Sequence, residues 1–217
     1  PLRTAPRLVP LISAIGASFF LQYTFRGFFG PGKYAYPSIT GLEGSWTILG
    51  IGILKVQVIV IIAAFVMMAL LYSIVMYTKM GKAMRAVSEN KDTAALMGID
   101  INRTIVSTFA IGAAMAGAAG VLYSIVYRQI DYFMGFTPGI KAFTAAVLGG
   151  IGNIPGAMVG GLVLGIFESV GPSLFLEGLG IPRPYQLKDV IAFTMLVMIL
   201  LFRPSGILGE RLTTKKA

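Results

Sequence analysis

The chain has 217 residues, is strongly apolar and carries few charges. Hydrophobic residues make up 56% of it and charged residues 12%, about half the charged share of soluble domains. A core of this size cannot bury so many apolar side chains, so we expect lipid to be the solvent. The composition excludes a disordered chain, a nucleic-acid-binding domain and almost any soluble enzyme. The sequence contains neither Cys nor His, and we expect no metal site and no cofactor.

Five apolar stretches predict an all-α, polytopic transmembrane helix bundle that forms one domain over residues 1–217. The second stretch gives roughly 33 Å of helix, enough to cross a hydrocarbon core of about 30 Å. A glycine-rich run at 149–156 breaks the fourth, which predicts either two short passes or one re-entrant hairpin. The fifth reaches spanning length only if its helix begins near Tyr185. The stretches are 8–25, 56–77, 104–127, 140–170 and 190–202.

The basic residues predict the orientation of the chain in a bacterial inner membrane. Segments 1–7, 79–103 and 203–217 carry 11 Lys and Arg in 47 residues, whereas 26–47, 128–139 and 172–189 carry 5 in 52. Because positive loops stay in the cytoplasm, we expect the first group, including the C-terminus, inside. The net charge of +9 then reflects orientation and not nucleic acid. The sequence begins at Pro1 without a signal-peptide pattern, and we expect a piece of a longer protein.

Two glycine-rich runs resemble nucleotide-binding loops only superficially. The run Gly27–Tyr34 nearly matches a P-loop, but Tyr34 stands where Ser or Thr must hold Mg²⁺. The glycines of 149–156 miss the spacing of a dinucleotide loop, and no strand-helix-strand context surrounds them. We therefore expect no ATP site and no enzymatic activity in this chain.

The helix break and a few intramembrane polar residues are candidates for a translocation path. Broken helices at membrane depth often mark transport sites, although a tight turn between packed helices explains the same pattern. Glu168 is the carboxylate lying well inside an apolar stretch, which favours a functional role unless it reaches the outer headgroups. The path candidates are Glu168, Thr144, Asn153 and Gln22.

Small residues recur at four-residue spacing in the third and fourth stretches. This spacing lets helix backbones approach closely in lipid. It predicts that both helices are packed inside a bundle and that further helices take part. The predicted packing residues are Gly112, Ala116, Gly120, Gly156, Gly160, Gly161 and Gly165.

The segment 79–103 predicts a short helix on the cytoplasmic side. Ser88 or Asn90 can cap its beginning, and Gly98 suits the left-handed residue after its end. Between them, Ala94–Met97 form a shallow apolar surface surrounded by charge. An ordinary loop on the headgroups is the alternative.

The pattern Glu89…Ala94-Ala95-Leu96-Met97-Gly98-Ile99, followed by Arg103 and a membrane helix, resembles the coupling loop of ABC importer permeases. It departs from the fuller version of this motif in sugar permeases and more closely resembles branched-chain amino acid permeases of the LivH type. The resemblance covers nearly the whole chain, but members of that family begin with additional helices. Further matching stretches are Leu11–Gly16 with Phe20–Gln22, Phe109–Gly120, Lys141–Ala157 and Pro204–Gly209.

The resemblance implies a membrane subunit of an ATP-driven importer of leucine, isoleucine and valine. Its implied partners are a second, LivM-like permease, two ABC ATPase subunits and an external substrate-binding protein. Coupling to the ATPases would use Ala94, Ala95, Leu96 and Gly98, with Glu89, Lys91 and Asp92 setting the register. The alternatives are a urea or short-amide permease of the same family, a free-standing channel or secondary transporter, and a scaffold without transport.

Overall fold

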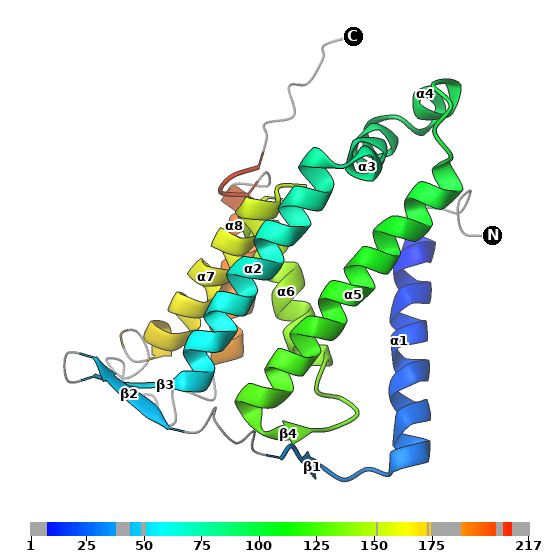
Figure 1. Ribbon diagram of the computed structural model, residues 1–217. Coiled ribbons are helices and arrows are strands. Elements are labelled where there is room, and N and C mark those ends of the chain that lie inside the picture. Colours follow the sequence, from blue (N-terminus) through cyan, green and yellow to red (C-terminus); the bar gives the residue numbers. More distant parts are fainter. Residues whose placement is uncertain are drawn as a thin grey trace. The chain divides into compact units, whose positions relative to one another are not determined.

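The computed structural model of the protein is built almost entirely from helices (Figure 1). It describes residues 8–37, 44–48, 51–150, 152–172, 174, 188–202 and 206–209. The helices in these ranges are α1 (Leu8–Phe29), α2 (Lys55–Tyr77), α3 (Lys79–Glu89), α4 (Lys91–Leu96), α5 (Ile101–Tyr127), α6 (Phe136–Gly149), α7 (Ile154–Gly171) and α8 (Lys188–Phe202). The strands are β1 (Tyr34–Ala35), β2 (Ser45–Ile48), β3 (Ile51–Leu54) and β4 (Gln129–Ile130).

All five predicted apolar stretches lie in helices, which confirms the all-α prediction. The first, second, third and fifth correspond to α1, α2, α5 and α8, and the fourth divides into α6 and α7. Helices α2, α5 and α7 are long and apolar enough to cross a membrane. Tyr185, where we expected the last helix to begin, lies outside the described residues, as do residues 210–217.

Contacts group the chain into two compact units, residues 1–60 with 116–136 and residues 61–115 with 137–217. The boundary runs through α2 and α5, so single helices continue from one unit into the other. The prediction of one domain over residues 1–217 stays a prediction.

The first unit joins the segment after α1 to the segment after α5. Strand β1 pairs antiparallel with β4, with Tyr34 opposite Ile130. Strands β2 and β3 form a separate antiparallel hairpin. Ring contacts between Phe19 and Phe136, and between Tyr23 and Tyr132, place α1 against the segment after β4 at centroid distances of 6.1 and 6.4 Å.

The second unit contains the predicted helix break, which is narrower than the run 149–156. Helix α6 ends at Gly149, and α7 begins at Ile154 with Pro155 in its first turn. The Asn153 side chain caps α7 by accepting a hydrogen bond from the backbone N–H of Gly156, at 2.9 Å. The break is thus a turn between two helices, which is the tight-turn alternative.

Glycines allow α6 and α7 to touch through their backbones. A Cβ atom on Gly160 would lie 2.1 Å from the carbonyl oxygen of Ala145, and one on Gly149 would lie 1.9 Å from that of Gly156. No side chain fits in either place, so the two helix backbones approach each other directly there, as small residues allow. Leu164 continues this contact and forms a small core with Ala145 and Met195 of α8.

The other predicted packing residues do not make such contacts within the described part of the chain. A Cβ atom on Gly112, Gly120 or Gly165 would meet nothing within 4 Å, and one on Gly161 would make only an ordinary contact. Ala116 is exposed. Small residues at four-residue spacing show where a neighbouring helix can approach closely, but they do not show which helix, if any, lies there. The prediction that these five residues pack against helices stays a prediction that concerns further helices.

Helices α2 and α5 present apolar surface along their length. No described residue of α2 is buried, and the most apolar 18 residues of α5 contain no buried residue either. Exposed side chains such as Ile62, Val66 and Phe109 cannot face water without a large cost. These surfaces require lipid or other helices as neighbours.

Candidate functional site

The predicted coupling segment forms two short helices, α3 and α4, between the spanning helices α2 and α5 (Figure 1). Helix α3 begins immediately after α2, because Thr78 caps it by accepting a hydrogen bond from the N–H of Gly81, at 3.0 Å. Gly81 lies so close to the end of α2 that a Cβ atom there would be 2.2 Å from the carbonyl oxygen of Val75. Only glycine permits this sharp reversal of the chain.

Arg85 holds α3 onto the end of α2. Its Nη2 donates a hydrogen bond to the carbonyl oxygen of Met76, at 3.3 Å. The last carbonyls of a helix lack partners within the helix and carry partial negative charge, so a guanidinium suits this position. The clamp makes α2 and α3 a mechanically connected pair.

Asn90 connects α3 to α4, as predicted. Its side-chain oxygen accepts hydrogen bonds from the N–H groups of Asp92 and Thr93, at 3.0 and 3.1 Å. The predicted alternative, Ser88, instead donates its hydroxyl to the carbonyl oxygen of Arg85. Asn90 thus ends one helix and begins the next with little intervening chain.

Gly98 ends α4 in the left-handed conformation that we predicted, with φ at +81°. The N–H of Gly98 bonds to the carbonyl of Ala95 and that of Ile99 to the carbonyl of Ala94, the pair of bonds of a Schellman motif. Two residues later, the side chain of Asp100 accepts a hydrogen bond from the N–H of Arg103 in the first turn of α5. Helix α4 is therefore joined firmly to α5.

The tip of α4 is an exposed apolar knob formed by Ala95, Leu96 and Met97. Leu96 is 89% exposed and Met97 76% exposed. Ala94 differs from its neighbours, since it is only 2% exposed and packs inside the protein. The prediction that Ala94 contacts a partner is corrected by this burial. Glu89 and Gly98 remain exposed on either side of the knob.

Glu168 is part of a cluster of charged side chains. The Lys141 ammonium of α6 lies 3.0 Å from Oε2 of Glu168 on α7 and 2.8 Å from Oδ1 of Asp189 on α8. Glu168 lies three residues before the end of α7, and Asp189 is in the first turn of α8. The cluster thus ties three helices together near one end, and these contacts give Glu168 a structural role.

Two other path candidates are also occupied by structural contacts. Thr144 is 1% exposed, and its hydroxyl donates to the carbonyl of Ile140 in its own helix, at 3.0 Å. Asn153 caps α7 and donates its amide to the carbonyl of Leu208, at 2.9 Å. This second bond attaches residues 206–209, which follow α8, to the turn between α6 and α7. Neither side chain presents a free polar group for a path.

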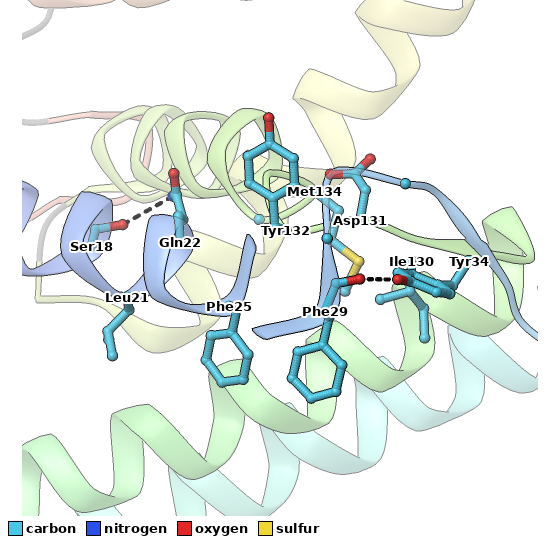
Figure 2. Close-up of a pocket in the computed structure, with 13 residues that line it drawn as sticks. Ser18, Leu21, Gln22, Phe25, Phe29, Tyr34, Ile130, Asp131, Tyr132 and Met134 are labelled. Carbon is cyan, nitrogen blue, oxygen red and sulfur yellow. Dashed lines mark hydrogen bonds between the residues drawn. The ribbon is translucent and has the colours of Figure 1, made fainter. Parts of the chain in front are cut away.

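Gln22, the fourth candidate, lines a pocket of about 570 Å³ in the first unit (Figure 2). The pocket lies between the second half of α1 and the segment 130–135, and the paired residues Tyr34 of β1 and Ile130 of β4 also line it. The hydroxyl of Tyr34 donates a hydrogen bond to the carbonyl of Phe29, another lining residue. The remaining lining residues are Ser18, Leu21, Phe25, Gly30, Gly32, Asp131, Tyr132, Met134 and Gly135.

Sequence reasoning did not predict this pocket as a whole. Gln22 was noticed because it interrupts an apolar helix, whereas Asp131 and Tyr132 lie in a loop about 110 residues away. Their approach depends on the pairing of β1 with β4, two-residue strands that no sequence pattern indicates. The run Gly27–Tyr34 contributes to the pocket wall, and a strand follows it where a P-loop needs a helix.

Apolar spanning helices, a closely packed helical hairpin and an exposed knob between two spanning helices define a multi-pass membrane transport subunit. The chain belongs to the family described as branched-chain amino acid transport system / permease component, whose model matches residues 7–200. This membership confirms the resemblance found in the sequence.

The curated relatives agree with the family assignment. The chain is 44% identical to the high-affinity branched-chain amino acid transport system permease protein LivH of Escherichia coli, over 97% of this chain and 67% of that protein. It is 43% identical to the corresponding protein BraD of Pseudomonas aeruginosa, over the same shares. A probable permease protein LivM of Methanocaldococcus jannaschii is 30% identical over 70% of this chain and 46% of that protein. No solved structure matches the chain.

Proposed function

We propose that this chain is a membrane-spanning permease subunit of an ATP-driven importer of branched-chain amino acids. Family membership supports the class of protein, and the names of relatives such as LivH support the substrate. The observation that carries the mechanism is the exposed apolar knob Ala95–Met97, mounted between two spanning helices by hydrogen-bonded caps. The urea, short-amide and free-standing channel alternatives have no comparable support.

The knob transmits the work of ATP hydrolysis from partner subunits. Leu96 and Met97 enter a groove on a cytoplasmic ATPase, and Ala95 lies flat against it. Glu89, Lys91 and Asp92 are exposed around the knob and set its register by charge. Because Arg85 and Asn90 fix α3 to α2 and to α4, and the Gly98 turn and Asp100 fix α4 to α5, movement of the knob tilts both spanning helices. Hydrolysis itself takes place in the ATPases.

The proposed orientation has loop 79–103 and the C-terminus in the cytoplasm. The pairing of β1 with β4 supports it, because the charge distribution assigns both loops to the outside and the strands hold them together. The bond from Asn153 to Leu208 also agrees, since it brings the turn between α6 and α7 to the end of α8. In this orientation α6 and α7 form a hairpin that returns the chain to the outside, and the ion cluster of Lys141 lies toward the outer face.

The partners are a second permease of the LivM kind, two ATPases and an external substrate-binding protein. Exposed apolar faces on α2 and α5 support a helical neighbour, because they lack one within the described residues. The open small-residue face at Gly112, Ala116 and Gly120 supports the same conclusion, since it admits another backbone at close range. The aromatic rings of α1 and β1 lie on the side proposed for the binding protein.

Isolation of the intact complex tests this proposal. The tagged full-length parent protein is extracted from native membranes in mild detergent, and its companions are identified by mass spectrometry. We expect two P-loop ATPases and a second permease, and we expect the Leu96→Asp variant to retain the permease while losing the ATPases. Recovery of the wild-type protein alone, at normal yield, would favour a free-standing channel and overturn the proposal.

A further inference from the structure

The pocket of the first unit combines a largely apolar wall with a few polar side chains, as sites for small amphipathic molecules do. Its volume of about 570 Å³ exceeds that of an amino acid and leaves room for water. Leu21, Phe25 and Met134 form apolar and polarisable parts of the pocket wall. The pocket is formed entirely by α1, the loop after it and the segment 130–135, all within one unit.

The first polar group of the pocket is the amide of Gln22. Its nitrogen donates a hydrogen bond to the hydroxyl of Ser18, at 3.2 Å, as Figure 2 shows. Its oxygen is buried and accepts no hydrogen bond from the described residues. A buried acceptor without a donor is costly and is a place where a ligand N–H or ammonium gains most.

Two opposite charges accompany this acceptor. Asp131 lines the pocket; one of its carboxylate oxygens accepts the N–H of Phe133, at 2.7 Å, and no cation of the described chain pairs with it. Arg26 does not itself line the pocket, but its guanidinium lies beside it, over the ring of the lining residue Tyr132, 5.3 Å from the ring centroid. Arg26 likewise forms no ion pair among the described residues.

We propose that this pocket binds the free zwitterion of an apolar amino acid. The ammonium group is received by the Asp131 carboxylate and the Gln22 amide oxygen, the carboxylate by the Arg26 guanidinium, and the side chain by Leu21, Phe25 and Met134. A lipid tail carries no charged group that could pair with these two side chains. A charged amino acid side chain would be left unpaired against the apolar wall.

This site deepens the proposed function, on which it rests, because the proposed orientation opens the pocket toward the outside. There it receives the amino acid that the binding protein releases, before the helices tilt. The site would also impose its own selectivity on the importer. It rejects molecules that lack either charge or carry a polar side chain.

Leucine binding to the intact complex, without ATP and without the binding protein, tests the site. The complex is placed in nanodiscs, and bound radiolabelled leucine is measured against unlabelled competitors. We expect isoleucine and valine to compete, and leucinamide, 4-methylpentanoate, lysine and glutamate to compete at least tenfold less well, because each loses one charged contact or adds an unpaired charge.

Two variants test which residue binds the ammonium group of leucine and which binds its carboxylate. Asp131→Asn retains an oxygen for the N–H of Phe133, and we expect it to weaken leucine binding about tenfold or more while improving the relative binding of 4-methylpentanoate. Arg26→Gln should weaken leucine binding likewise and improve the relative binding of leucinamide. Lys33→Gln is the control, since Lys33 is exposed and does not line the pocket.

Unchanged leucine affinity in both Asp131→Asn and Arg26→Gln would overturn the proposed site. The same conclusion would follow if fatty acids displaced labelled leucine equally well from the wild-type complex and from Asp131→Asn. Either result leaves the proposed function intact if the same complex, supplied with ATP and binding protein, still transports leucine. Failure of that transport in the wild-type complex would instead count against the proposed function. The two ideas therefore fail in different measurements.

Discussion

The ammonium of Lys141 lies 3.0 Å from a carboxylate oxygen of Glu168, which joins α6 to α7 across 27 residues of sequence. Asp189 of α8 shares the same ammonium at 2.8 Å. Glu168 is only 17% exposed in its side chain, so the pair is largely shielded from solvent. One cation thus balances two acids at the point where three helices meet.

Removal of the cation should destabilise this end of the bundle. We expect Lys141→Met to lower the thermal unfolding temperature of the complex, because two carboxylates then face each other without a partner. A charged hydrogen bond contributes about 1.5–3 kcal/mol, which sets the expected loss. Adding Glu168→Gln to Lys141→Met should restore part of it. If the single and double variants unfold at the same temperature as the wild-type complex, the charge cluster does not stabilise the contact between the helices.

The contact of Gly160 with Ala145 predicts opposite effects for two similar substitutions in α7. Gly160→Ala places a Cβ atom 2.1 Å from a backbone oxygen and should cost about 1–3 kcal/mol through forced separation of the helices. Gly165→Ala, where a Cβ atom meets nothing within 4 Å, should be neutral or stabilise by up to about 1 kcal/mol through helix propensity. Unfolding in detergent, followed by circular dichroism, distinguishes them. Equal stability of the two variants would contradict the observed packing.

The positive φ angle of Gly98 predicts a graded response to substitution at the end of α4. A β-branched residue is strained there by roughly 1–2 kcal/mol, whereas Asn tolerates the left-handed region. We expect Gly98→Val to reduce leucine uptake strongly at normal membrane yield, and Gly98→Asn to retain most of it. Comparable uptake by both variants would show that the turn geometry does not matter for coupling.

Local rules were sufficient where a single segment determines its own structure. The spanning helices, the Asn90 cap and the left-handed Gly98 follow from hydropathy and capping chemistry, and the structure confirms each of them. They need no knowledge of distant residues.

Predictions failed where the outcome depends on which segments meet. Gly112 and Gly165 have the same kind of spacing as Gly160, yet of these three glycines only Gly160 has another backbone opposite it among the described residues. The sequence does not reveal that Glu168 shares the ammonium of Lys141 with Asp189, because these residues are 27 and 21 positions away. The pocket at Gln22 needs the pairing of β1 with β4, which local propensity does not encode.

The most direct test of the account is ATP-driven uptake by the reconstituted complex. Proteoliposomes holding both permeases and both ATPases are given external binding protein and labelled leucine, with ATP inside. We expect uptake that requires ATP, and we expect Ala95→Asp to abolish it with normal assembly in the membrane, because the new charge lies in the ATPase contact. Ser45→Asp, with the same charge on the exposed β2–β3 hairpin, is the control and should transport normally. Leucine uptake at the wild-type rate by Ala95→Asp would contradict the coupling role of α4.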